Sequence, residues 1–458
     1  MDKKTNDHNE WITERDLIEY FHTGSKETQN WSIGTENEKF LFYRDSLEPI
    51  NYYGPNGIEE IFKFLMEVYS WQPIHDKDYV IGLNDKDHNS SISLEPGGQI
   101  ELSGSLCKNL HQTNEEFLNY HKQLKHACDT IGVDALGLGF TPKWDFSDMT
   151  QVPKTRYHFM RKYMPTVGSL GLYMMHCSAT TQVNLDYGSE QDFNKKFRVA
   201  MSLQPLVSML FYNSPFRNGK STNLLSNRIS VWKDTDNDRC GYLPFAFEKD
   251  LNFEKYANYA LNVPMYFIYR NGKYIIPKKM LFKEYLQNGF RDEEDIEYYP
   301  SLEDWETHLS TLFPQVRLKK FIEMRGADSG NHASIISLAS IWTGMMYSSS
   351  SLDASYDLVK EWTLLDVLEF ENNLNKSGFD AKFQKFNITD LISEIIAISL
   401  SGLNDRNIYN NDQQTEEIYM RPLQDILNKK ETPSDDLIKK FNTVWSQDIN
   451  NIYNYSNI

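Results

Sequence analysis

The apolar positions along the chain follow the period of a helix in some segments and that of a strand in others. Apolar residues three or four apart predict amphipathic helices, and strict alternation predicts half-buried strands. Helices are predicted over residues 11–21, 58–71, 113–132, 192–211, 333–375 and 380–402. Strands are predicted over 32–43, within 75–104, and over 180–187, 226–235 and 317–328.

Strands and helices are mixed along the whole chain, and the sequence has no internal repeat and no linker that would divide it. This mixture predicts an α+β fold with a mainly antiparallel sheet. The length of 458 residues suits one large domain, which we expect over 1–403. Residues 404–458 are rich in Asn, Asp, Tyr and Gln and are expected to form a peripheral helical cap. Residues 1–10 are expected to be a polar tail.

Composition and charge narrow the classes of function. Hydrophobic residues make up 40% of the chain, enough for a packed core, and the net charge is −17. A field of that sign disfavours nucleic acid and anionic membranes as partners. The N-terminus lacks an apolar segment, no apolar run could span a membrane, and only four cysteines occur, without a CxxC pair. We therefore expect a cytoplasmic protein.

Four of the predicted strands carry unusual polar residues on one face. Because residues two apart in a strand share a face, the following sets each lie together: Glu36 with Glu38; Glu95, Gln99, Glu101 and Ser103; Gln182 with Asn184 and Asp186; and Glu323 with Arg325. A Pro-Gly-Gly insert leaves the face of Glu95 open, since it could form a bulge.

The polar faces have two interpretations. Any one of these strands, taken alone, could belong to a sheet with one solvent-exposed face. Taken together, they place several glutamates in strands, where glutamate is depleted. Carboxylates crowded on one sheet face repel one another unless a cation lies among them. Carboxylate and amide oxygens are ligands for Mg²⁺, and phosphate oxygens complete its shell. The set therefore predicts a floor that binds magnesium and a nucleotide.

Eight segments carry a resemblance to a known family. The segments are IGTENEKF, SLEPGGQIELSG, RYHFMRKYMPTVGSLGLYMM, TTQVNLDYGSEQDFNKKFR, NSPFRNGKS, SNRISVWKDTDNDRCGYLPF, NVPMYFIYR and FIEMRGAD. In this order they resemble glutamate–cysteine ligase of the plant type, which also occurs in bacteria. The resemblance runs from about residue 31 to residue 345.

The resemblance implies a fold and an activity. The fold would be that of glutamine synthetase-like ligases, a curved antiparallel sheet forming a funnel with helices packed outside. The ligase would occupy 1–403 and form γ-glutamylcysteine from L-glutamate, L-cysteine and ATP, the first step of glutathione synthesis. It would act through a γ-glutamyl phosphate with roughly two or three Mg²⁺ ions, or Mn²⁺. No partner beyond these small molecules is implied, and the oligomeric state stays open.

The resemblance also assigns roles to residues of this sequence. Metal ligands would be Glu36, Glu38, Glu101, Glu323 and Gln182. Glu101 and Arg325 would be catalytic, and Asn184 and Arg325 would contact the nucleotide. Substrate-binding residues would be Arg228, which would clamp a glutamate carboxylate, Trp232, Tyr266, Met164 and Met175. The segment at His176 and Cys177 departs from the plant pattern, and the plant regulatory disulfides are not carried over.

Other interpretations remain open. A ligase of the same fold could join glutamate to a different amine, and a non-catalytic protein could have kept the fold. The run SPFRNGKS resembles the sequence of a phosphate-binding loop. It has Ser214 in place of the first glycine and Pro215 within the loop, so a simple turn is favoured. Arg156, Arg161 and Lys162 form a basic cluster that suits either the surface or a phosphate.

Overall fold

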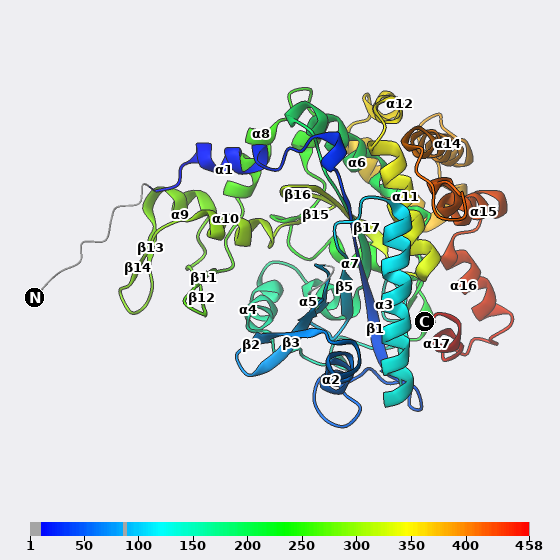
Figure 1. Ribbon diagram of the computed structural model, residues 1–458, viewed down its shortest axis with the longest axis horizontal. Coiled ribbons are helices and arrows are strands. Elements are labelled where there is room, and N and C mark those ends of the chain that lie inside the picture. The colour runs from blue at the N-terminus through cyan, green and yellow to red at the C-terminus, as the bar shows by residue number, and fades with distance from the viewer. Residues whose placement is uncertain (1–10, 86–88, 458) are drawn as a thin grey trace, which may run out of the picture.

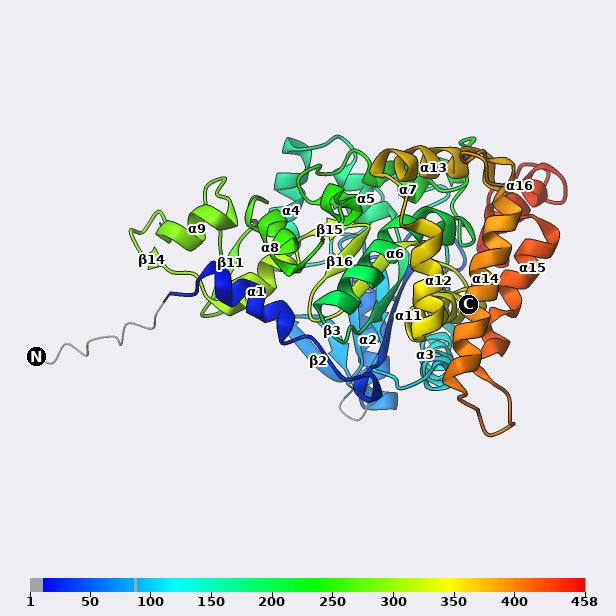
Figure 2. The same cartoon turned by 90° about the horizontal axis from the view of Figure 1, so that it is seen from above.

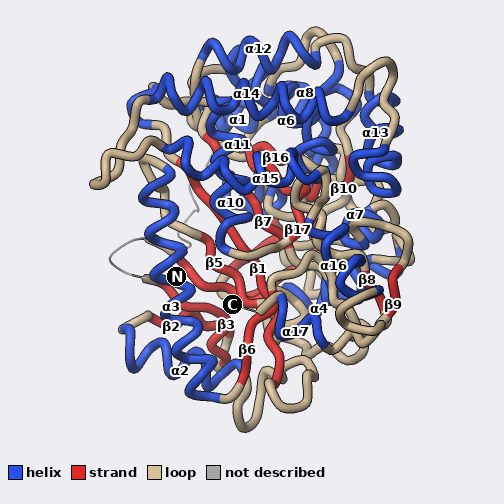
Figure 3. Tube along the Cα trace, turned by 90° about the vertical axis from the view of Figure 1, so that its right-hand side faces the viewer, coloured by secondary structure: helices blue, strands red, loops and turns tan. Residues whose placement is uncertain are grey.

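A computed structural model describes residues 11–85 and 89–457, so the expected tail over 1–10, and residues 86–88 within the region of predicted strands, lie outside the described residues. Its centre is one large open sheet whose strands all pair antiparallel (Figures 1 and 3). In order of pairing, the strands are β16 (Val316–Leu318), β17 (Ile322–Asp328), β7 (Thr180–Leu185), β1 (Ile33–Tyr43), β5 (Ile100–Ser103), β4 (Ser91–Leu94), β3 (Tyr79–Asn84) and β2 (Gln72–Asp76), and β6 (Val133–Leu136) pairs with the far part of β1. The predicted α+β class with a mainly antiparallel sheet is confirmed.

Long helices cover one face of this sheet. They are α3 (Leu110–Ile131), α6 (Glu190–Met209) and α11 (His332–Met346), with α12 (Ser349–Val359), α13 (Leu364–Ser377) and α14 (Ile388–Arg406) packed around them. Figure 2 shows α14 on the outer side of α11. Apolar strand residues such as Val183 and Met324 point into this layer and are fully buried with α6 and α11. The helix pattern predicted from residue 192 onward is confirmed, and Pro205 lies inside α6.

Shorter elements surround the two ends of the sheet. The helices are α1 (Glu14–His22), α2 (Ile58–Tyr69), α4 (Thr155–Tyr163), α5 (Gly171–Cys177), α7 (Asn227–Trp232), α8 (Phe253–Leu261), α9 (Phe282–Asn288) and α10 (Leu302–Leu309). The small strands are β8 (Phe216–Arg217), β9 (Lys220–Ser221), β10 (Cys240–Gly241), β11 (Ile268–Arg270), β12 (Lys273–Ile275), β13 (Phe290–Arg291), β14 (Glu297–Tyr298) and β15 (Phe313–Pro314). No helix among the described residues combines the length and apolar character needed to cross a membrane.

Two local predictions meet different outcomes. The strand predicted over 226–235 is wrong, because residues 227–232 form helix α7. The Ser226 side chain accepts a hydrogen bond from the backbone N–H of Ile229 and so caps the first turn, and an alternation as short as Ile229 and Val231 cannot outweigh it. The simple turn favoured for SPFRNGKS is confirmed, since β8 and β9 form a hairpin around Asn218 and Gly219.

The C-terminal segment packs against the rest of the chain. It contains α15 (Arg421–Lys429), α16 (Pro433–Asn442) and α17 (Asn451–Tyr455). Tyr453 of α17 is fully buried, with its ring 5.1 Å from Phe42 of β1 and 5.3 Å from Trp144. The boundary at residue 403 stays a prediction, and contacts such as these tie the segment to the sheet.

Candidate active site

The strand register brings the predicted polar residues onto one face. Directly paired residues of neighbouring strands share a face, and the pairs are Glu38 with Glu101, Glu36 with Gln182, and Asn184 with Glu323. The face is the one opposite the long helices. The alternation read from the sequence therefore places these side chains together across four strands.

The turn between β4 and β5 adds another carboxylate. The backbone N–H of Gly98 donates to the carbonyl of Glu95 at 2.9 Å, and Gly98 takes a φ of +85°, a conformation that favours glycine. The Pro-Gly-Gly insert thus forms a tight turn. Glu95, whose face the sequence left open, lies with Glu101 along the same cavity.

A cavity of about 320 Å³ lies over this polar face. The carboxylates in its described lining are Glu36, Glu38, Glu95, Glu101 and Glu323, and the cationic side chains are Lys154, Arg156, Arg228, Arg317, Lys319 and Arg325. Gln182, Trp232 and Met175 line it as well. An acidic floor with basic walls suits a ligand that carries both cations and anionic groups, such as a metal–polyphosphate complex.

Three carboxylates of the polar face, Glu36, Glu38 and Glu101, have too little positive charge nearby to offset the cost of burying a negative charge. Burial, with Glu95 and Glu101 nearby, raises the pKa of Glu38 well above its usual value. Burial, with Glu36 and Glu95, raises the pKa of Glu101 to about 8. The pKa of Glu36 is raised by burial and by Glu323. Buried carboxylates that repel one another are the environment that a divalent cation relieves, so these side chains fit the predicted metal.

Glu323 lies in a different environment from the other floor carboxylates. Its oxygens accept from Nε and Nη2 of Arg317 at 2.5 and 2.9 Å and from Nη1 of Arg325 at 3.1 Å. Burial opposes its ionisation, yet Arg317 and the neighbouring cations hold the pKa of Glu323 well below its usual value. In the described residues no three His, Cys, Asp or Glu side chains are grouped closely enough to hold a metal ion. The predicted metal ligands share a face without forming a preassembled cluster.

Arg325 and Asn184 are fixed by the floor. Arg325 Nη1 donates to Oε1 of Gln182 at 2.5 Å as well as to Glu323. Asn184 Nδ2 donates to Glu36 Oε1 at 2.8 Å, and Asn184 is not among the residues that line the cavity. Arg325 therefore faces the space over the floor, and Asn184 supports Glu36.

Helix α7 brings Arg228 and Trp232 to the edge of the cavity. The guanidinium of Arg228 donates to the carbonyls of Arg325 at 2.7 Å and Gly326 at 3.1 Å, and burial lowers its pKa to about 10. Nε of Arg228 and Nε1 of Trp232 are buried without a hydrogen-bond partner among the described residues. Both side chains therefore have an unpaired buried donor at the edge of the cavity.

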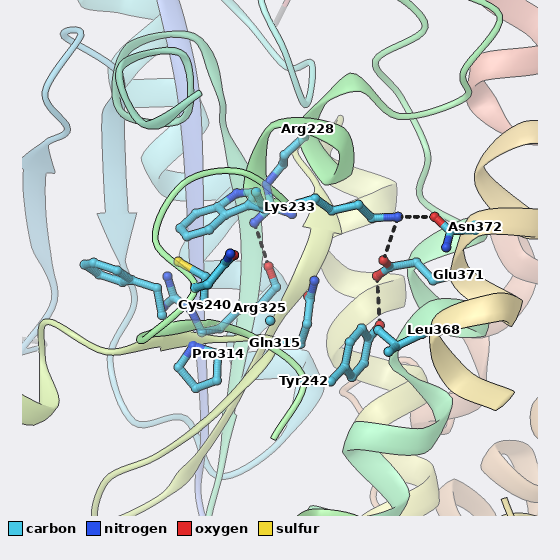
Figure 4. A pocket seen from close by; sticks show the side chains of 14 residues that line it. Arg228, Lys233, Cys240, Tyr242, Pro314, Gln315, Arg325, Leu368, Glu371 and Asn372 are labelled. Carbon is cyan, nitrogen blue, oxygen red and sulfur yellow. Dashed lines mark hydrogen bonds and ion pairs between the residues drawn. The ribbon is translucent and has the colours of Figure 1, made fainter. Parts of the chain in front are cut away.

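A second cavity, of about 280 Å³, adjoins the first and shares lining residues with it (Figure 4). Arg228, Trp232, Phe313 and Arg325 line both cavities. On the far side of the second cavity, Glu371 accepts from Tyr242 at 2.8 Å and pairs with Lys233 at 3.1 Å. The shared residues thus face two cavities.

Two of the predicted substrate residues lie away from the cavity. Met164 and Tyr266 are buried, with the Tyr266 hydroxyl 3.7 Å from the Met164 sulfur, and neither lines either cavity. The ring of Tyr266 packs under the guanidinium of Arg239 at 3.9 Å. Their predicted contact with substrate stays a prediction.

The sequence reasoning missed several cationic side chains of the cavity. Arg317 pairs with Glu323 from the next strand, and Lys319 follows it in the same segment. Lys154 precedes α4, and nothing in its local sequence marked it. Of the basic cluster at 156–162, Arg156 alone lines the cavity. A hint was present in RLKKFIEMRGAD, where cations precede a strand that carries a glutamate.

Comparison with known proteins extends these observations. Residues 32–455 match the model of glutamate-cysteine ligase family 2. Glutamate–cysteine ligase B, chloroplastic, of Oryza sativa subsp. japonica is 41% identical over 442 residues, which are 96% of this chain and 86% of the relative. The chloroplastic glutamate–cysteine ligase of Arabidopsis thaliana is 39% identical, with 96% of this chain and 82% of the relative covered.

Among solved structures, glutamate–cysteine ligase from Francisella tularensis in complex with AMP has a similar fold. The TM-score is 0.56 at 11% sequence identity, and the match covers 92% of this chain and 86% of that one. At this identity the likeness concerns the fold alone. It agrees with the helical and mainly antiparallel architecture described above.

The names of the plant relatives contradict the predicted cytoplasmic location. These relatives are called chloroplastic, so their names place them in a plastid and not in the cytoplasm. The prediction depended on few cysteines and on the lack of an apolar N-terminal segment. Such features separate reducing from oxidising compartments but not one reducing compartment from another. The cytoplasmic prediction is therefore wrong.

Proposed function

The chain belongs to glutamate-cysteine ligase family 2, and we propose that it uses ATP to join the side-chain carboxylate of L-glutamate to the amine of L-cysteine. The product would be γ-glutamylcysteine, and the reaction would be the first step of glutathione synthesis. The observation that carries the proposal is the cavity in which buried, mutually repelling carboxylates face a wall of arginines and lysines.

The reaction would proceed in two displacements. An oxygen of the glutamate γ-carboxylate attacks the γ-phosphorus of ATP, the bond to ADP breaks, and γ-glutamyl phosphate forms. The cysteine amine then attacks the activated carbonyl carbon, inorganic phosphate leaves, and a proton is lost from nitrogen. Splitting the reaction in this way replaces oxide, a very poor leaving group, with phosphate.

The side chains of the cavity would position the reactants. Arg325, fixed by Gln182 and Glu323, faces the space above the floor and would balance charge on the transferring phosphoryl group. Arg228 and Trp232, which keep unpartnered donors at the wall, would bind a carboxylate of glutamate. Holding both reactants on one wall makes the attack effectively intramolecular.

Glu36, Glu38 and Glu101 are the residues that would hold Mg²⁺, or Mn²⁺, with Gln182 beside them. When bound, the metal would neutralise phosphate charge and polarise the phosphoryl oxygens. Glu323, the other glutamate proposed for the metal, is paired with Arg317 and Arg325 in this structure. The catalytic role of Glu101 and the nucleotide contact of Asn184 remain part of this proposal.

Phosphate release tests the function directly. The purified protein would be assayed with ATP, Mg²⁺ and glutamate, with cysteine, with a simple alkylamine or with no amine, and the products would be weighed by mass spectrometry. We expect phosphate release that depends on cysteine and on Mg²⁺, with a γ-glutamylcysteine mass. Release with the alkylamine alone would overturn the substrate, and release with no amine at all would overturn the proposal.

A further inference from the structure

The carboxylate of Glu323 is enclosed by cationic side chains. Arg317 binds both of its oxygens, at 2.5 and 2.9 Å, and Arg325 lies 3.1 Å from one of them. Lys319 Nζ is 3.9 Å from the other oxygen. Glu36, Glu38 and Glu101 have no such paired arginine in the described chain. Glu323 is therefore the floor carboxylate whose charge is already balanced.

Arg317 is held firmly in this position. Its Nη1 donates to the carbonyls of Ser310 and Leu312, both at 3.0 Å, while Nε and Nη2 face Glu323. The side chain of Arg317 is 7% exposed and that of Glu323 is fully buried. A guanidinium fixed by two backbone carbonyls and two carboxylate oxygens cannot turn away without leaving buried donors unpaired. A cation approaching Glu323 must therefore compete with Arg317 in place.

The charged side chains that line the cavity determine which ligand can compete with Arg317 for Glu323. Its described lining carries five carboxylates and six cationic side chains, so the formal balance favours anions slightly. A bare divalent cation at Glu323 would meet Arg317, Lys319 and Arg325 at short range. A polyphosphate brings oxygens that can accept from these same donors and lower their repulsion toward the cation.

We propose that Arg317 makes the Glu323 end of the cavity accept a divalent cation only together with the phosphates of a nucleotide. The phosphate oxygens would accept from Lys319 and Arg325 and would share the donors of Arg317. An oxygen of Glu323 would then be available to the cation. Without them, Arg317 occupies that carboxylate. This inference takes the nucleotide from the proposed function. Its test measures binding only and does not require the enzyme to turn over.

The test is a Mn²⁺ titration followed by the electron paramagnetic resonance signal of free Mn²⁺, with and without a non-hydrolysable ATP analogue. A blank without protein corrects for Mn²⁺ held by the analogue alone. The variants are Arg317→Met, which removes the competing charge, and Arg317→Met with Glu323→Gln, which removes the pair at constant net charge. Arg291→Met is the matched control, because Arg291 pairs with Asp295 and Glu297 on an exposed hairpin.

We expect Arg317→Met to bind Mn²⁺ about tenfold more tightly than the wild type without nucleotide, because a freed buried carboxylate gains a cation. The double variant should match the wild type without nucleotide and lose affinity only when the analogue is present. Arg291→Met should behave as the wild type in both conditions.

Unchanged or weaker nucleotide-free binding by Arg317→Met would overturn the inference. If that variant does not fold, the double variant decides, since replacing both members of a buried pair is better tolerated than removing one. Weaker nucleotide-free binding by the double variant would show that Glu323 already serves the cation in the free protein. Phosphate release plays no part in these titrations, so a wrong substrate proposal would leave them interpretable.

Discussion

Replacing Glu101 by Gln should make the metal-free protein more stable while it removes activity. Glu101 lies directly opposite Glu38 on the neighbouring strand, and both are buried. Burial, with Glu36 and Glu95, raises the pKa of Glu101 from 4.5 to about 8. Glutamine keeps the size and can still accept the 2.7 Å hydrogen bond from Ser103, but it carries no charge.

The magnitude follows from the pKa difference between the folded and unfolded chains. With a folded pKa above the unfolded one, the folded state carries no penalty from Glu101 well below pH 4.5, and the penalty grows as the pH rises toward 8. At pH 7 it amounts to about 3 kcal/mol, and at pH 5 to about 1 kcal/mol. For a chain of 458 residues, 3 kcal/mol corresponds to about 3 °C in Tm.

Thermal unfolding in EDTA at pH 5 and pH 7 measures this effect, with Glu369→Gln as the control because Glu369 is exposed on α13. We expect Glu101→Gln to melt higher than the wild type, by more at pH 7 than at pH 5, and to release phosphate far more slowly. Added Mg²⁺ and ATP should raise the Tm of the wild type but hardly that of the variant. A lower Tm for Glu101→Gln at pH 7 would refute the reasoning that this carboxylate is held for a cation.

Three further predictions concern the wall, the cysteines and the α7 cap. Arg228→Ala should raise the KM for glutamate much more than the KM for ATP, because Arg228 would bind a glutamate carboxylate; equal rises in steady-state assays would contradict that role. Burial raises the pKa of Cys107 to about 11 and of Cys128, Cys177 and Cys240 to about 12. Iodoacetamide at pH 8 should therefore label the folded protein slowly and the unfolded protein quickly, as mass spectrometry would show, and rapid labelling of the folded protein would refute the burial argument. Ser226→Ala should destabilise the fold by about 1–3 kcal/mol in urea unfolding, since Ser226 caps α7 and donates to Asp328 at 2.9 Å; an unchanged midpoint would contradict this.

Strand alternation was sufficient to predict which polar side chains within one strand share a face. Glu36 and Glu38, or Glu323 and Arg325, are two apart, and a period of two assigns them to a face without knowledge of the rest of the fold. It could not predict that Glu38 lies opposite Glu101, because register depends on pairing between segments far apart in the chain.

The wrong strand and the missed cavity residues depend on contacts that the alternation of apolar and polar residues does not encode. Ile229 and Val231 alternate as in a strand, yet they lie in helix α7. Ser226 caps the first turn of this helix, and Arg228 donates to the β17 backbone. Arg317 and Lys154 reach the cavity from an edge strand and from the approach to α4, and no local pattern marks such positions. Met164 and Tyr266 were assigned by resemblance; in this structure they pack against each other, and their contact with substrate stays a prediction.

The transfer of an oxygen atom from glutamate to phosphate tests the central claim most directly. The protein would be given ATP, Mg²⁺, cysteine and glutamate labelled with oxygen-18 in its γ-carboxylate, and both products would be examined by mass spectrometry. We predict γ-glutamylcysteine and inorganic phosphate that carries one labelled oxygen per turnover, because the carboxylate oxygen is retained when the acyl phosphate breaks. Phosphate without label, formed together with γ-glutamylcysteine, would contradict the account.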